Sequence, residues 1–441
     1  MRQPAGGAVG SHRPQRSHIG HTTMGLYLLA IFLSAFLLFQ VQPLIGKFLL
    51  PWFGGTAGVW TACLLFFQIA LLSGYSYANL ISSRFSRRYQ AMWHLGVLGV
   101  SLLFLPFLPD LSWRPTGTES PTQHILLLLT IHIGVPFAVL SSIGPLLQSW
   151  FSQTFSGRSP YRLYDLSNAG LLLALVSYPF LVEPSLTLQT QALIWSWGYR
   201  VFVVLCGWCA WRFFLSHRPL EASEPEGSTS DCQSTTTAES DTSLRKADVL
   251  FWLLLAATGS AMLLATTNRI CEDLAVVPLL WILPLAIYLI TFILCFDHDW
   301  WYQRSIFEPS LAVSALAVVF IMRSGYLIVW AQIGVYAATL FVCCMTCHGE
   351  LARSKPVAER LTWFYMIVAA GGALGGVSVT IAAPYVFKDY WEYHLVLSAT
   401  VLLAIVCVSR DAFAATGQAS ARLLWRRRLT WATVAALVGC H

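Results

Sequence analysis

Charged side chains are scarce in this sequence. Only 11% of its 441 residues are Asp, Glu, Lys or Arg, whereas 56% are hydrophobic. Soluble domains carry roughly 25% charged residues, so this composition excludes an ordinary soluble protein. Apolar runs of about 18 residues or more recur along the chain, and runs of that length suit helices that cross a lipid bilayer. We therefore expect an all-α polytopic membrane protein embedded in the bilayer.

Three further signals are missing. The sequence has no strand that is followed by a Gly-rich loop, a helix and then an acidic residue. The dinucleotide-binding fingerprint, which needs that pattern, is therefore excluded. The first apolar run, from Met24, has no small-residue cleavage site, so we expect no cleaved signal peptide. Most of the 11 cysteines lie in apolar runs, where they act as small hydrophobes rather than as a disulfide framework. These patterns predict no catalytic residue, no cofactor and no metal site.

Hydropathy divides the chain into two sets of six spans. We expect a first six-helix bundle at 23–215 and a second at 247–410, joined by a polar cytoplasmic linker at 216–246. The tail 1–22 is expected to be disordered, and 411–441 to form a basic segment with a truncated thirteenth span. The twelve expected spans lie near 24–41, 57–81, 91–108, 124–148, 160–181, 190–214, 248–267, 274–296, 306–323, 327–348, 361–386 and 391–409.

The basic residues indicate how these spans are oriented. If the N-terminus lies inside, 21 of the 27 Lys and Arg residues fall in inside segments. That bias is typical of cytoplasmic loops, so we expect an inner (plasma) membrane protein with both ends in the cytoplasm. The formal charge of +6 then reflects topology, and we expect no nucleic-acid partner.

Basic residues and a proline mark the start of a predicted helix near residue 158. The same pattern of residues recurs in the second half of the chain. Tyr164 precedes Gly170 by six residues, and Tyr365 precedes Gly371 by the same interval. Gly371 and Gly375 also form a Gly-x-x-x-Gly pair, which predicts close packing between helices. We therefore expect two related halves.

The expected organisation resembles that of the major facilitator superfamily, which has six spans, a cytoplasmic linker and six more spans. Its members carry a Gly-x-Leu-x-Asp-Arg-x-Gly-Arg-Arg loop after the second span, which this chain matches at Arg84, Arg87 and Arg88. Asn79 and Ser83 replace the Gly and the Asp of that motif. The resemblance therefore does not extend to the charge lock that the motif provides.

Five segments carry a more specific resemblance. They are Gln42–Gly55, Gly144–Phe151, 158–184, Asn268–Pro278 and Cys347–Arg353. Together they resemble the membrane portion of the fused major-facilitator/spermidine-synthase-like proteins of bacteria. The resemblance implies a transporter-like fold, a link to polyamines, and a C-terminal or partner aminopropyltransferase domain. The Gly-rich loop of that enzyme domain is not found in this chain.

Acidic residues in or beside the spans are the candidate binding groups, because a charge near the bilayer centre costs roughly 2.5–3.5 kcal/mol. Asp165, in the first turn of its helix, either pairs with Arg162 and the helix N-terminus or forms a gate or cation site. Glu183, between two prolines, is either solvated at a span end or functional. Glu272 and Asp273, in the short joint between spans seven and eight, are either a solvated pair or part of a broken helix that lines a cavity.

Three aromatic residues and one lysine complete the candidate site. Trp60, Trp281 and Tyr288 fall within spans, where their rings would attract an organic cation. Lys47 lies in an interrupted hydrophobic stretch after the first span. That stretch is either an interfacial or re-entrant helix or a contact for an anionic substrate.

Two main functions are open at this point. The first is transport of a polyamine or similar small organic cation, with Asp165, Glu272 and Asp273 as counter-charges between two rocking bundles. Pro179 and Pro284 would permit the motion, Pro284 by breaking its helix. The second is a membrane platform for an aminopropyltransferase domain, without transport.

A minor third hypothesis is a redox or haem protein. Cys344, Cys347 and His348 have the spacing of a c-type haem attachment motif. We reject this reading, because such attachment occurs outside the cytoplasm and this span end is predicted to lie inside.

Overall fold

The computed structural model is helical, and the part of the chain that it describes contains no strand. The structure describes residues 15–54, 56–115, 120–154, 161–215, 246–273, 280, 282–324, 328–356, 361–387 and 391–414. Trp281, most of the predicted linker and most of the predicted thirteenth span lie outside these ranges. The following candidates have a described helical backbone but no described side chain: Arg162, Tyr164, Asp165, Glu272 and Asp273.

Among its described residues, the first half contains eight α-helices, two of which are continuations of a neighbour. They are α1 (Gln15–Phe53), α2 (Ala57–Arg84), α3 (Arg87–Ser101), α4 (Pro121–His132), α5 (Gly134–Thr154), α6 (Tyr161–Ser177), α7 (Glu183–Ser185) and α8 (Leu188–Leu215). A π-helical turn, Tyr178–Val182, joins α6 to α7, and a bend of 70° separates α4 from α5.

The second half repeats this order. Its helices are α9 (Lys246–Asp273), α10 (Ile282–Asp297), α11 (Arg304–Ser324), α12 (Val329–Arg353), α13 (Leu361–Val377), α14 (Ala383–Val386) and α15 (Trp391–Ala414). A π-helical turn, Ser378–Ala382, joins α13 to α14.

Among the described residues, nine helices are long and apolar enough to cross a membrane, or ten when the bent pair α4–α5 counts as one span. The shorter helices α3 and α10 lie at the places of the third and eighth predicted spans. Each of the twelve predicted spans therefore corresponds to a helix. The prediction of a polytopic helical membrane protein in two six-span sets is confirmed.

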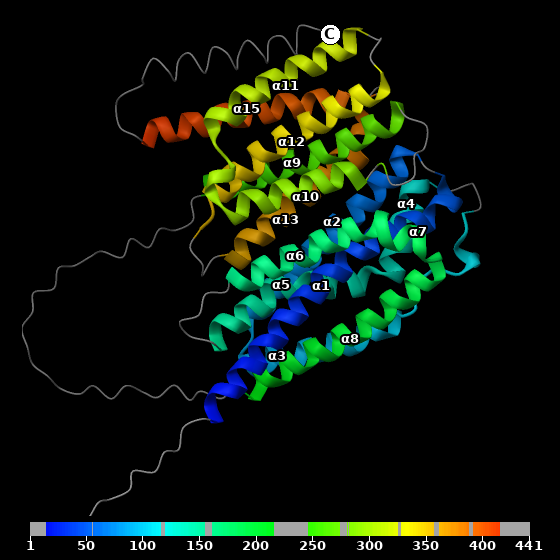
Figure 1. Ribbon diagram of the computed structural model, residues 1–441, viewed down its shortest axis with the longest axis vertical. Helices are drawn as coiled ribbons and strands as arrows, with labels where there is room; N and C mark the ends of the chain where they lie inside the picture. The colour runs from blue at the N-terminus through cyan, green and yellow to red at the C-terminus, as the bar shows by residue number, and fades with distance from the viewer. Residues whose placement is uncertain are drawn as a thin grey trace, which may run out of the picture.

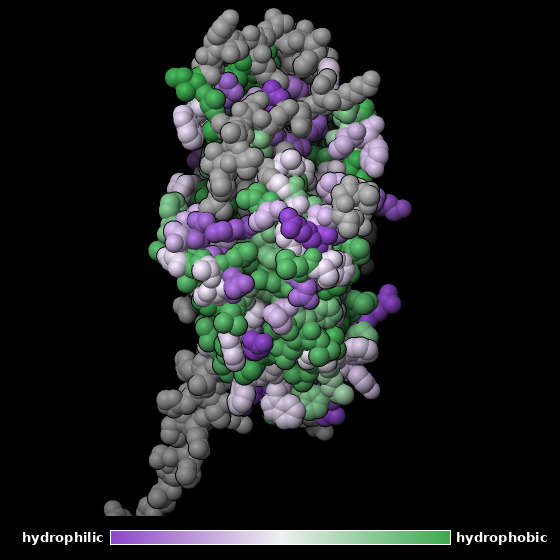
Figure 2. All heavy atoms as spheres, turned by 90° about the vertical axis from the view of Figure 1, so that its right-hand side faces the viewer, coloured by the Kyte–Doolittle hydropathy of each residue, from purple (hydrophilic) through white to green (hydrophobic). Residues whose placement is uncertain are grey.

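The helices run side by side, with the second half stacked on the first (Figure 1). α1 begins and α15 ends at the same end of the molecule, which we call the terminal end, and α7 lies at the opposite, distal end (Figure 1). Side chains on the outward faces are apolar and exposed, such as Val204 (70%) on α8 and Phe320 (66%) on α11, as contact with lipid requires. Figure 2 looks onto the distal end, where a continuous hydrophobic area covers the lower part of the view, on the first half.

The two halves share local details that reveal the repeat. Gly170 of α6 lies so close to α1 that a Cβ atom would come within 2.7 Å of the Phe32 carbonyl oxygen. Gly371 of α13 lies against α9 in the same way, and a Cβ there would come within 2.6 Å of the Leu253 carbonyl oxygen. Both helices then pass into a π-helical turn and a short helix. Small residues thus let α6 and α13 approach their neighbours in equivalent places.

The structure departs from the sequence-based expectations at three points. α1 is one helix that begins at Gln15, inside the tail expected to be irregular, and continues through Pro43 to Phe53. Lys47 therefore lies on a continuous helix and not on a re-entrant segment. α9 continues to Asp273, so Glu272 and Asp273 belong to its last turn rather than to a joint.

Pro284 does not break a helix either. It occupies the third position of α10, where a backbone N–H has no partner within the helix and a proline costs little. Pro179 lies in the π-helical turn after α6, so this proline does coincide with an irregular backbone.

Candidate functional site

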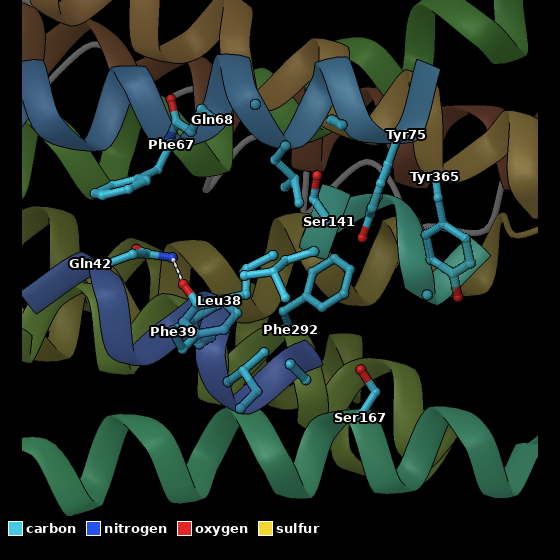
Figure 3. Close-up of a pocket in the computed structure, with 18 of the residues that line it drawn as sticks. Leu38, Phe39, Gln42, Phe67, Gln68, Tyr75, Ser141, Ser167, Phe292 and Tyr365 are labelled. Carbon is cyan, nitrogen blue, oxygen red and sulfur yellow. Dashed lines mark hydrogen bonds between the residues drawn. The ribbon is translucent and has the colours of Figure 1, made fainter. Parts of the chain in front are cut away.

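A cavity of about 240 Å³ lies between the two halves (Figure 3). The first half contributes residues of α1, α2, α5 and α6, and the second half contributes residues of α9, α10 and α13. Along these helices the lining residues lie around the middle of the molecule. Tyr365, near the start of α13, lies toward the terminal end, whereas Gln42 of α1 lies toward the distal end.

The cavity is lined mostly by aliphatic and aromatic residues, with ten neutral polar residues among them. Among the described lining residues none is an Asp, Glu, Lys, Arg or His. Figure 3 shows Tyr75 and Tyr365 on one side, Phe67 and Gln42 at the other, and Phe292 between them. The polar lining residues are Ser34, Gln42, Gln68, Tyr75, Ser141, Gln148, Ser167, Asn168, Tyr288 and Tyr365.

Gln68 of α2 connects the two halves at the side of this cavity. Its amide nitrogen donates to the Ser260 hydroxyl of α9 at 2.7 Å, and that hydroxyl donates to the Gly372 carbonyl oxygen of α13 at 2.9 Å. The Oε1 atom of Gln68 is buried and has no hydrogen-bond partner. An unsatisfied buried acceptor of this kind costs about 1–3 kcal/mol.

The halves also meet nearer the distal end. The Thr380 hydroxyl, in the π-helical turn after α13, donates to the Thr61 carbonyl oxygen of α2 at 3.4 Å. Thr61 lies one turn from the start of α2, whereas Tyr75 of the cavity lies closer to its end. The halves therefore also contact each other on the distal side of the cavity.

Of the predicted binding residues, Tyr288 lines the cavity. Trp60 is 5% exposed in the packed core of α2 and is not among the described lining residues. Lys47 and Glu183 are not among them either, because they pair with each other at 2.7 Å, where α1 meets the turn after α6. Their charges are satisfied mutually at a half-exposed site, which does not fit the separate substrate contacts that we expected.

The predicted structural residues have identifiable contacts. Arg87 donates through Nε to the Gln153 side chain at 3.0 Å, so it fastens the start of α3 to the end of α5. Arg84 and Arg88 are exposed at the same terminal end. Gly375, like Gly371, lies against α9, where a Cβ would come within 2.9 Å of the Ala261 nitrogen.

Sequence reasoning missed the polar residues that line the cavity. Gln68 was detectable, since it is a lone amide in the apolar run Leu64–Leu71 and an unpaired amide in lipid is costly. Tyr75 and Ser260 had no such signal, because hydroxyl groups are common in helices of any environment. The search for charges directed attention to acids and away from these neutral groups.

The fold is that of known membrane transporters. The POT family transporter PepTSo has 13% identity and a TM-score of 0.57 over 90% of this chain and 99% of its own. The xylose transporter XylE from E. coli, in its inward open conformation, has 11% identity and a TM-score of 0.52 over 87% of this chain and 95% of its own. At this identity the likeness shows the fold alone, which is the major facilitator type.

No protein-family model matches the sequence, and no curated protein matches it. The fold and the cavity therefore define this protein as a multi-pass membrane protein with a transporter-like architecture.

Proposed function

We propose that this protein moves a small organic solute across a membrane by alternating access. The observation that carries the proposal is the cavity shared by both halves, with a contact between the halves on its distal side. Rocking of the two halves would expose such a cavity first on one side and then on the other. The bond from Gln68 to Ser260 joins the halves beside the cavity and would break in that motion.

The cargo that best suits the cavity is uncharged and polar. Hydroxyl and amide groups satisfy neutral hydrogen-bonding solutes, and the rings of Phe67, Tyr75 and Phe292 offer apolar faces. Sugar-like and nucleoside-like molecules combine both features. A charged solute would lose its hydration here without gaining an opposite charge from any described lining residue.

A polyamine is the second candidate cargo, because the sequence resembles proteins fused to a spermidine-synthase-like domain. A polyamine needs at least one carboxylate. Asp165 lies on α6, two positions before the lining residue Ser167. The polyamine proposal therefore depends on Asp165.

The biological setting is also proposed from the sequence. The excess of Lys and Arg in the predicted inside segments supports an inner membrane location with cytoplasmic ends. The terminal end of the molecule would then face the cytoplasm. A platform for an aminopropyltransferase domain remains the alternative function, and it requires no movement of solute.

Uptake into proteoliposomes tests these proposals. The purified chain would be assayed with labelled pentoses, nucleosides and spermidine. Gln68→Leu preserves size but removes the inter-half bond, and we expect at least a tenfold loss of uptake. Val204→Ala, on the lipid-facing surface of α8, is the matched control and should leave uptake unchanged.

The outcomes separate the candidates. Uptake of neutral solutes alone supports the uncharged cargo. Uptake of spermidine that disappears in Asp165→Asn supports the polyamine. Absence of uptake for every solute, in liposomes where the protein is folded and correctly inserted, refutes transport and favours the platform.

A further inference from the structure

His348 of α12 is a buried titratable group next to the cavity. Its side chain is 1% exposed, and its ring packs edge-on against Tyr288 and Phe292, with ring centroids 4.7 and 5.2 Å away. Tyr288 and Phe292 both line the cavity, so one layer of aromatic side chains separates the imidazole from a bound solute.

The hydrogen bonds of Thr291 favour a proton on Nδ1 of His348. When the Thr291 hydroxyl donates to the Tyr288 carbonyl oxygen at 2.8 Å, its oxygen accepts from His348 Nδ1, 3.0 Å away. A neutral imidazole has one donor nitrogen and one acceptor nitrogen. Nε2 is therefore the basic nitrogen, and it is buried without a hydrogen-bond partner.

Nε2 faces the backbone of α9 at Gly259, where an added Cβ would lie 3.4 Å from it. The next residue, Ser260, is the one that Gln68 holds across the halves. A protonated Nε2 would place an N–H donor and a positive charge against this segment, where no acceptor is provided. Burying such an unpaired charge is costly, so protonation disfavours this packing of α9.

Among the described residues, no other group around His348 supplies the missing negative charge. The described carboxylates on α12 and on the α-helices packed against it are engaged elsewhere or lie on α11: Glu350 binds Arg304 and Tyr302, Asp248 of α9 binds Arg410, Glu392 of α15 accepts from Asn268, Asp297 of α10 lies beside His298, and Glu308 belongs to α11. The cation Arg269 of α9 donates to Tyr336, and the remaining titratable groups include the thiols Cys343, Cys344 and Cys347 of α12, Cys295 of α10 and Cys407 of α15, and the phenol of Tyr288.

We propose that His348 is a proton-binding site that couples proton uptake to opening of the cavity on the distal side. In its neutral form the ring permits the packing of α9 that holds Ser260 against Gln68. Protonation weakens that packing, releases the bond between the halves, and favours the state open at the distal end. The proposal rests on the proposed transport function and makes that transport proton-dependent.

A distance measurement tests the coupling without any solute. Nitroxide labels would be placed through a non-natural amino acid at Thr56, before α2, and Tyr385, on α14, both exposed at the distal end. The full chain in nanodiscs would be titrated from pH 8 to pH 5. We expect the longer-distance population to grow on acidification, by up to about tenfold per pH unit, the limit for one linked proton.

Two variants should abolish this response. His348→Asn removes the basic nitrogen, and Gly259→Ala fills the space that a protonated, hydrated ring would need. The matched control is His94→Gln, a buried histidine of the first half whose nitrogens are bonded to Tyr77 and Cys206. This control should keep the pH response.

A pH response that persists in His348→Asn, or a wild-type chain that does not respond, overturns the proposal. Nitrogen NMR of ¹⁵N-histidine-labelled wild-type protein provides a test that needs no folded variant. At pH 8 the His348 signal should report hydrogen on Nδ1 and none on Nε2, and the reverse result also overturns the proposal. Solute uptake that is independent of pH would refute the coupling and leave the proposed function intact.

Discussion

The buried ion pair of Arg304 and Glu350 allows a quantitative test of what holds the second half together. Glu350, in the last turn of α12, has a side chain that is 4% exposed, while Arg304, at the start of α11, is 16% exposed. The Glu350 carboxylate accepts two bonds from this guanidinium and a third from the Tyr302 hydroxyl at 3.0 Å. These bonds fasten the connection between α10 and α11 to the end of α12.

Glu350→Gln keeps the shape but removes the carboxylate charge that pairs with Arg304. Removing one partner of a buried pair costs about 3–5 kcal/mol, and partial exposure of Arg304 lowers this to about 2–4 kcal/mol. The double variant Arg304→Met/Glu350→Leu removes both charges and should be less destabilised than the sum of the single changes. Reversible unfolding in mixed micelles measures each free energy.

The first half provides the matched control. Arg87 occupies the place of Arg304 at the start of α3, but its partner at the end of α5 is the neutral Gln153. Gln153→Glu recreates the carboxylate of the second half, where attraction to Arg87 is opposed by the helix C-terminus. We expect a change within about 1 kcal/mol. If Glu350→Gln costs as little as that, the reasoning that burial makes the second pair strong is refuted.

The same contact predicts a dependence on alkaline pH. Tyr302 lies in the connection before α11, and burial, followed by the adjacent Glu350 carboxylate, raises its pKa above the usual value of 10.0. Because the folded protein holds this proton more tightly than the unfolded chain, the contribution to stability is complete below about pH 10 and is lost as the pH rises further. Tyr302→Phe should flatten the loss of stability above pH 10, and an unchanged slope would contradict this assignment.

Two further predictions concern the helix contacts at the cavity. Gly375→Ala should destabilise the fold by about 1–3 kcal/mol, because the added Cβ would meet the Ala257 carbonyl oxygen of α9. In Gly372→Ala the added Cβ meets nothing within 4 Å, so this change should stabilise the fold by up to about 1 kcal/mol through helix propensity. Thermal unfolding in detergent compares the two, and equal effects would exclude the packing argument. Ser260→Ala removes the hydroxyl to which the Gln68 amide donates. A distance measurement should then find the population open at the distal end raised several-fold. An unchanged population would mean that this bond does not hold the halves together.

Much of the fold could be predicted because its physical cause is visible in the sequence. A helix that crosses a bilayer must be apolar along its length, and each of the twelve predicted spans corresponds to a helix. Boundaries were less predictable where proline was read as a break. Pro43 lies within the continuous helix α1, and Pro284 lies in the first turn of α10, because a proline is tolerated where its missing N–H is not needed or the packing compensates.

The site was harder to predict, since its chemistry depends on pairing in three dimensions. Lys47 and Glu183 are 136 positions apart, and the sequence alone could not show that they satisfy each other. Conversely, His348 was considered only as part of a haem motif, although its bond to Thr291 is what determines its chemistry. Composition identified polar groups in an apolar chain, but it could not say which of them find partners.

The two halves show how a repeated architecture becomes asymmetric. α2 packs along α13, whereas the equivalent pair of helices, α6 and α10, meets at few positions. The glycines explain part of this difference: Gly376 lets α13 approach α2 so closely that its Cβ would come within 3.0 Å of Leu65, beside Gln68. The α2–α13 interface is therefore tight and lies beside the bond from Gln68 to Ser260 of α9, while its counterpart is looser. The halves thus differ in the side chains at these contacts and not in their helix order.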